Sequence, residues 1–226
     1  MKSSLQKGIA AAFIFFVPGV FAATLGLQPL PYNGVYIGAA VGASDLLDSE
    51  KTTNSVTDIH HFSAIGFIGG GLIGYDLTLH NKFKLGLEGF INGTTASASA
   101  TQNYSPESSY NISMNYNTGL RILPGYEFSP GTVGYLLLGY SYGNFSIKDT
   151  GDYGFINQSF GENGFQFGLG IKTPIYKNFS IRGDLIYTAY ASQTSYGLTN
   201  PPTETQTYYN TPATFEGMLS LVYKFS

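Results

Sequence analysis

The segment from Phe179 to Tyr190, FSIRGDLIYTAY, constrains the fold more than any other part of the chain. Successive side chains of a β-strand point to opposite faces, so this segment has one apolar face and one largely polar face that carries Arg182 and Asp184. The same alternation returns about eight times at similar length. If the apolar face contacts lipid and the charged face lines a closed interior, the whole chain is one membrane barrel.

The alternating segments are separated by connections that are long and short in turn. The expected strands cover residues 34–46, 62–79, 83–95, 112–122, 133–147, 165–172, 179–190 and 215–225. The long connections are 48–61, 96–110, 149–162 and 197–210, and the short ones are 80–82, 129–132 and 177–178. Outer-membrane barrels have short periplasmic turns and long extracellular loops. The rhythm therefore predicts an all-β fold, an eight-stranded antiparallel up-and-down transmembrane β-barrel.

Two of these strands carry finer expectations. Alternation over 112–122 places a set of apolar side chains on one outward face, namely Ile112, Met114, Tyr116, Leu120 and Ile122. In the strand at 133–147, three leucines at positions 136–138 are consecutive. A β-bulge and a packed interior would both explain such a run.

The composition suits a barrel that hides its polar residues inside. Only 11% of the 226 residues are charged, against about 25% in an average soluble domain. The formal net charge of −3 provides no basic surface for phosphates, which argues against nucleic acid as a main partner. Because the chain has no cysteine, disulfides, a thiol nucleophile and a cysteine-linked lipid anchor are excluded.

Residues 1–22 have the three regions of a secretory signal peptide. Two lysines give a positive start, residues 9–17 form a short apolar core, and Ala22 ends a cleavage site. We therefore expect an exported protein whose residues 23–226 form one barrel domain.

The last residues of the chain, LSLVYKFS, place Tyr223 and Phe225 two positions apart on the apolar face. This end resembles the C-terminal recognition strand that barrel-assembly machinery reads, although it closes on Ser226. Together with the hairpin at 177–188, it makes residues 32–226 similar to the small eight-stranded outer-membrane barrels of the opacity-protein and OmpA transmembrane-domain group. The resemblance implies a monomer in a Gram-negative outer membrane. Its partners would be membrane lipids, lipopolysaccharide and the assembly machinery.

Motifs of catalysis and cofactor binding do not fit their surroundings. Residues 69–74 match G-x-G-x-x-G, but a strand follows where a dinucleotide site needs a helix. Ser141 lies in a G-x-S-x-G match, yet no histidine follows His80, so the triad order fails. His60 and His61 are adjacent, so on a strand they point to opposite faces and do not easily bind one metal ion; we interpret them as polar residues of the rim. We expect no catalytic residue, no metal site and no cofactor.

Charges enclosed by a barrel must be paired. The alternation turns five charged side chains inward: Glu88, Arg121, Arg182, Asp184 and Glu216. An eight-stranded barrel is filled by side chains, and an isolated buried charge costs on the order of several kcal/mol. We hypothesise a network in which the three acids bridge the two arginines and plug the interior.

The long connections are acidic, and recognition usually lies in loops carried by a rigid scaffold. We expect a non-catalytic surface antigen that serves envelope integrity or adhesion, with a host or environmental ligand at four long extracellular loops. A narrow pore or transporter for small solutes is the first alternative, and bilayer conductance separates the two. A lipid A-modifying enzyme is the second. A soluble periplasmic ligand-binding barrel, with its apolar face turned inward, is the third.

Overall fold

The computed structural model describes residues 33–53, 57–80, 82–102, 108–151, 154–198 and 205–225. Every regular element within these ranges is a β-strand. No helix in the described part is long and apolar enough to cross a membrane. The expected signal peptide, residues 1–22, lies outside the described residues.

Ten strands occupy eight positions in one wall. They are β1 (Gly34–Thr53), β2 (Thr57–His80), β3 (Phe83–Thr94), β4 (Ser97–Gln102), β5 (Ser108–Ser129), β6 (Thr132–Gly151), β7 (Gly154–Tyr176), β8 (Phe179–Tyr190), β9 (Gln193–Leu198) and β10 (Thr205–Lys224). After a break at residues 95–96, β4 continues the pairing of β3 with β5. After a break at 191–192, β9 likewise continues the pairing of β8 with β10.

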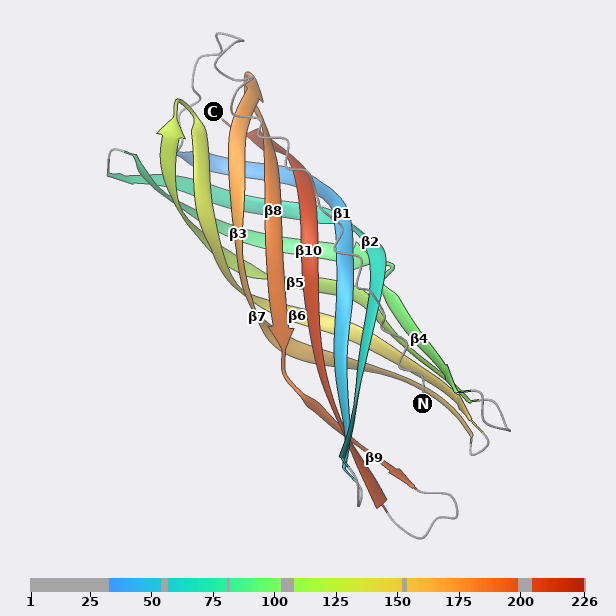
Figure 1. The fold of residues 1–226 in the computed structure, drawn as a ribbon. Coiled ribbons are helices and arrows are strands. Elements are labelled where there is room, and N and C mark those ends of the chain that lie inside the picture. The colour runs from blue at the N-terminus through green and yellow to red at the C-terminus, as the bar shows by residue number, and fades with distance from the viewer. Residues whose placement is uncertain are drawn as a thin grey trace, which may run out of the picture.

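The wall closes between the first and the last strand. β1 pairs antiparallel with β10 from Tyr36↔Lys224 to Thr53↔Thr207. The other strands pair with their neighbours in the order β1-β2-β3-β5-β6-β7-β8-β10, all antiparallel (Figure 1). Closure removes the two edges that an open sheet would leave. The predicted eight-stranded antiparallel barrel is confirmed.

The short turns and the C-terminus share one end of the barrel. Residues 130–131 join β5 to β6 and residues 177–178 join β7 to β8, as predicted. The side-chain amide of Asn178 donates to the carbonyl of Lys224 over 2.8 Å, so β10 ends beside a short turn. We call this end periplasmic, and we call the opposite end, toward which the strands extend further, extracellular.

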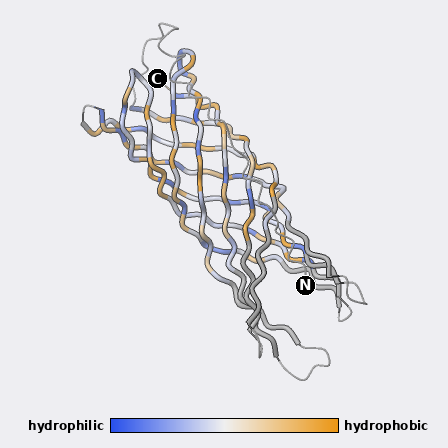
Figure 2. Tube along the Cα trace, viewed as in Figure 1, coloured by the Kyte–Doolittle hydropathy of each residue, from blue (hydrophilic) through white to orange (hydrophobic). Residues whose placement is uncertain are grey.

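The two faces of the wall differ in polarity. Large apolar side chains stand on the outside, where Phe67 is 80% exposed and Phe165 73% exposed. Apolar and polar residues alternate along the strands (Figure 2). An apolar band of this extent is foreign to the surface of a soluble monomer and suits contact with lipid.

A β-bulge in β5 reverses the expected faces of the first half of that strand. The register of β5 against β6 slips by one residue between Met114 and Tyr116. Leu120 faces outward as predicted, whereas Ile112 and Met114 are each only 1% exposed and lie inside. The prediction for these two residues is wrong. An extra residue changes the parity of a strand, and alternation alone does not show where it is inserted.

The run of leucines in β6 needs no bulge. Leu137 is fully buried, while Leu136 and Leu138 face outward. The register of β6 with β7 is continuous through these positions. The packed interior is therefore the explanation that holds.

The segments predicted to be long loops are largely paired strands in the described part of the chain. β1 and β2 stay paired up to Thr53↔Thr57, and β6 and β7 up to Gly151↔Gly154. The loop prediction is wrong here because ladder hydrogen bonds require no apolar side chain, so polar segments continue as hairpins past the apolar wall. The predictions corrected in this way are 48–61, 96–110, 149–162 and 197–210.

Close approach of β1 to β10 gives a first test of the packing. A Cβ added at Gly42 would overlap the carbonyl oxygen of Gly217 and lie 2.9 Å from the Cα of Met218. We expect Gly42→Ala to lower the free energy of unfolding by about 1–3 kcal/mol, the usual cost of overpacking. Urea unfolding in lipid vesicles, followed by far-UV circular dichroism, measures this loss.

Gly71→Ala is the matched control, because its added Cβ would meet its nearest atom, the carbonyl oxygen of Gly38, at 3.8 Å. An equal loss of stability in both variants would contradict the packing of β1 against β10.

Candidate functional site: the barrel interior

Arg182 of β8 lies at the centre of the charged interior. Its Nη2 donates to Glu88 Oε1 over 3.1 Å, its Nη1 pairs with Glu88 Oε2, and its Nε donates to Asp184 Oδ2 over 2.7 Å. The guanidinium is planar and carries five N–H donors, so it satisfies two carboxylates at once. Because Arg182 is only 1% exposed, these contacts replace the hydrogen bonds to water that its guanidinium loses on burial.

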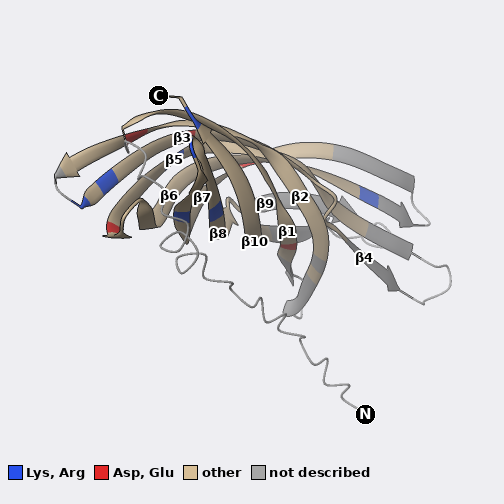
Figure 3. Ribbon diagram, turned by 90° about the horizontal axis from the view of Figure 1, so that it is seen from above, with Lys and Arg blue, Asp and Glu red and all other residues tan. Residues whose placement is uncertain are grey.

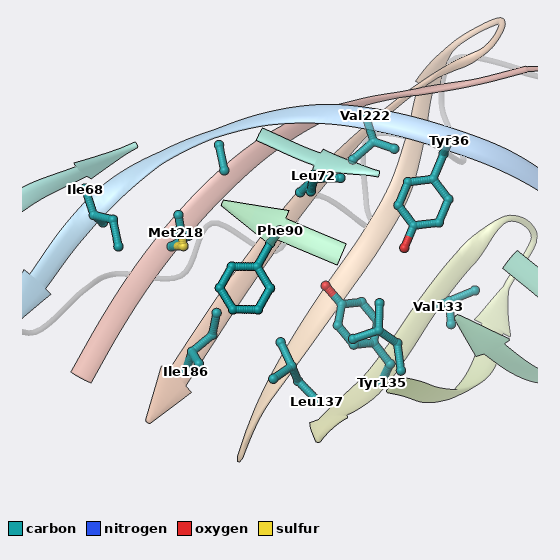
Figure 4. Close-up of a cluster of buried hydrophobic side chains, with 12 residues drawn as sticks. Tyr36, Ile68, Leu72, Phe90, Val133, Tyr135, Leu137, Ile186, Met218 and Val222 are labelled. Atoms are coloured by element: carbon teal, nitrogen blue, oxygen red, sulfur yellow. The ribbon is translucent and has the colours of Figure 1, made fainter. Parts of the chain in front are cut away.

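Two tyrosines complete the hydrogen bonding of the carboxylates. The Tyr36 hydroxyl donates to Glu88 Oε2 over 3.0 Å, and the Tyr135 hydroxyl donates to Asp184. Both rings belong to a buried apolar cluster, and their hydroxyls point toward the middle of the barrel (Figure 4). The cluster therefore holds the ring bodies while their polar tips enter the charge network.

Arg121 of β5 joins the same network through a second set of contacts. Its Nη1 lies 3.5 Å from Glu88 Oε1, and its Nε donates to Gln166 Oε1 over 2.8 Å. The guanidinium also lies over the ring of Phe90, 3.6 Å from its centroid. Glu88 thus connects the two arginines, the arrangement that the sequence suggested.

Glu216 stands apart from the arginines within the described residues, where no ion pair joins it to either one. Its Oε1 accepts from the Asn117 amide at 2.9 Å and from the Thr214 hydroxyl at 3.2 Å. The Asn92 amide donates in turn to Asn117 over 3.0 Å. Glu216 therefore belongs to an amide-rich layer that lies beside the arginine network.

A second charged cluster, which the sequence analysis did not single out, lies closer to the periplasmic end. The ammonium groups of Lys172 and Lys224 both lie 2.6 Å from Asp76 Oδ2. Lys84 is 3.0 Å from Glu127 Oε2. Alternation predicts that several of these side chains point inward. Which of them meet depends on how strands that are not neighbours in the wall are arranged across the interior.

The interior charges balance. Among the residues that the structure describes, they comprise five acidic side chains (Asp76, Glu88, Glu127, Asp184 and Glu216) and five basic ones (Lys84, Arg121, Lys172, Arg182 and Lys224). The charged positions lie on several strands around the wall (Figure 3). The equal numbers leave the enclosure without net charge, and Glu216, which has no ion pair among the described residues, is held by the Asn117 amide and the Thr214 hydroxyl instead.

Apolar side chains occupy the interior toward the extracellular end. Leu46, Ala96, Ile112, Met114, Phe145 and Tyr190 form a buried cluster with Ile147 and Phe160 packed against it. The Phe145 ring stacks on Phe160 at 5.5 Å and meets Tyr190 edge-on at 5.1 Å. Apolar side chains therefore fill the extracellular end of the interior, beyond the charged groups and the amide-rich layer.

Comparison with known families identifies the family to which the chain belongs. The sequence model of the outer membrane protein beta-barrel domain matches residues 9–225. The chain belongs to this family. Its members are outer-membrane barrels, so the predicted place of the chain among such barrels is confirmed, and the exposed apolar band of the fold faces lipid. A search of curated proteins gives no match.

A comparison with solved structures found several proteins at low similarity. Neisserial surface protein A is 14% identical, with 85% of this chain and 97% of that chain covered at a TM-score of 0.47. Outer membrane protease OmpT from Escherichia coli is 11% identical, with 88% and 99% covered at 0.49. Ail of Yersinia pestis is 12% identical, with 84% and 99% covered at 0.34. At these values, the likeness assigns no role to any residue of this chain.

The remaining predicted site residues fall at the ends of the strands. Tyr223 and Phe225 lie together on the periplasmic rim, with ring centroids 5.2 Å apart, and Tyr223 also meets Phe179 at 5.1 Å. Their reading by assembly machinery stays a prediction. The side chains of His60, His61 and His80 lie outside the described part. Among the described residues, no group of three or more histidine, cysteine or acidic side chains is arranged to hold a metal ion.

The central arginine gives the sharpest test of the network. Arg182→Met would leave Glu88 and Asp184 without their shared cation, so we expect the free energy of unfolding to fall by about 3–5 kcal/mol. The control is Lys148→Met, because Lys148 is an exposed lysine on β6, and its change should stay within about 0.5 kcal/mol. Urea unfolding in vesicles compares the two. Equal stability of both variants would refute a structural role for the network.

Proposed function

We propose that the chain is a non-catalytic outer-membrane protein that presents its extracellular hairpins for contact with a host or environmental ligand and contributes to envelope integrity. The observation that carries the proposal is the packed interior. Arg182, Glu88 and Asp184 fill the middle of the barrel with mutually bonded side chains, and the apolar cluster around Phe145 fills the extracellular part. A filled interior favours a scaffold over a conduit.

The hairpins support a role at the surface. β1 and β2 continue in register up to Thr53↔Thr57, and β6 and β7 up to Gly151↔Gly154, beyond the apolar band. Paired strands hold a projecting segment in one shape, which lowers the entropy lost when it binds a partner. Long ordered hairpins therefore suit recognition better than short loops would.

The same proposal includes the route to the membrane and the partners there. Residues 1–22 would direct export, and Tyr223 and Phe225 would be read by the barrel-assembly machinery. The mature protein would be a monomer among outer-membrane lipids and lipopolysaccharide.

Conductance tests the filled interior directly. We expect the refolded full chain to leave a planar bilayer near its baseline conductance, because the arginine network occupies the lumen. Steady, ion-selective conductance by the wild-type chain would instead favour the alternative of a narrow pore.

Epitope insertion tests which end faces outward. A tag inserted after Gly151, at the tip of the β6–β7 hairpin, should be labelled by antibody on intact cells. The matched tag after Pro130, in a short turn, should be labelled only after the outer membrane is permeabilised. Labelling in the reverse pattern would overturn both the orientation and the surface role.

A further inference from the structure

Two breaks in the wall mark the level at which the barrel stops being closed. At residues 95–96, the Thr95 N–H donates to the Phe67 carbonyl over 2.9 Å. At residues 191–192, the Ala191 N–H donates to the Asn163 carbonyl over 2.8 Å. Among the described residues, no strand ladder joins β2 to β4, or β7 to β9, beyond these two hydrogen bonds.

The extracellular part therefore consists of two separate sheets. One contains β9, β10, β1 and β2, and the other contains β4, β5, β6 and β7. Figure 1 shows β9 and β10 running apart from β4 and its neighbours. Each sheet has two edge strands, and an edge carries a row of backbone donors and acceptors that a further strand can use.

One of these edges is formed by residues 154–163 of β7, which have no ladder partner on the side away from β6 in the described part of the chain, and we call it the β7 edge. The Asn163 carbonyl points toward the side of β8 and β9, because it accepts from Ala191. Alternate residues of an antiparallel strand direct both backbone groups to the same neighbour. Gly161 and Ser159 therefore direct their N–H and C=O groups toward the side of β9, and β9 forms no ladder with β7.

The chemistry of the hairpins selects a partner. The described strands beyond the two breaks carry six acidic residues and two basic ones, namely Asp45, Asp48, Glu50, Asp58, Asp149 and Glu162 against Lys51 and Lys148. Glu162 lies within the β7 edge itself, and the neighbouring Phe160 packs toward the apolar cluster. A further strand paired with the β7 edge would lie near the carboxylate of Glu162, and one of its faces would lie near apolar side chains such as Phe160.

We propose that the β7 edge binds an extended basic polypeptide segment by strand addition, with backbone bonds to Ser159 and Gly161 and charge attraction from the acidic hairpins. Main-chain hydrogen bonds give affinity in this mode, and alternate side chains give specificity. The inference names the partner class for the surface role proposed above and rests on it.

The test uses the folded full chain in zwitterionic nanodiscs and a ten-residue peptide of alternating lysine and valine. The wild-type chain should bind the peptide and slow hydrogen exchange at Ser159 and Gly161. Ser159→Pro removes one N–H from the edge, which tolerates proline better than a central strand does. We expect it to weaken binding about tenfold. Ser159→Thr keeps the hydroxyl that lies 3.1 Å from Ser146 and should bind like wild type.

A second peptide separates backbone pairing from charge. It has the same sequence but is N-methylated at two adjacent central residues, which blocks both of its edges, and it should bind about tenfold more weakly. Equal binding of the two peptides, unchanged binding by Ser159→Pro, or no binding by wild type would each overturn strand addition. The surface role would survive these results, because it fails on the epitope and conductance tests instead.

Discussion

The fold depends on backbone hydrogen bonding in a solvent that offers none. Lipid cannot satisfy an exposed N–H or C=O group, so the strands that cross it must pair on both sides. The ladder from Tyr36↔Lys224 onward between β1 and β10 meets this requirement by making the last strand a neighbour of the first. Two further features follow from closure: the alternation of faces and the need to fill an enclosed interior.

The filling of the interior is an electrostatic problem as much as a packing problem. Glu88 contacts both Arg121 and Arg182, and Asp76 contacts two lysines, so single carboxylates serve several cations. These pairs connect β3 with its neighbour β5 and with the distant strand β8, and β2 with β7 and β10. The charge network therefore links strands across the interior that no ladder joins.

The strand alternation could be read from the sequence because its period is fixed by stereochemistry. The segment Phe179–Tyr190 was predicted to its ends, and the inward placement of Glu88, Arg121 and Arg182 followed from parity. Two features escaped. Met114 lies inside because a bulge adds one residue to β5, and alternation along a single strand does not show where such a residue is inserted. The polar hairpins were missed because their strands pair without the apolar residues that mark a strand of the wall. The contacts among the charges, including the cluster at Asp76, required the register of all eight positions.

The two breaks near Thr95 and Ala191 have an architectural consequence. Below them, every strand shares its register with two neighbours, so a shift in one strand propagates around the ring. Above them, the two sheets share no ladder in the described part of the chain. Insertions near the tips of one sheet would therefore leave the strand register of the other unchanged, which gives the exterior of the molecule freedom to diversify on an unchanged transmembrane body.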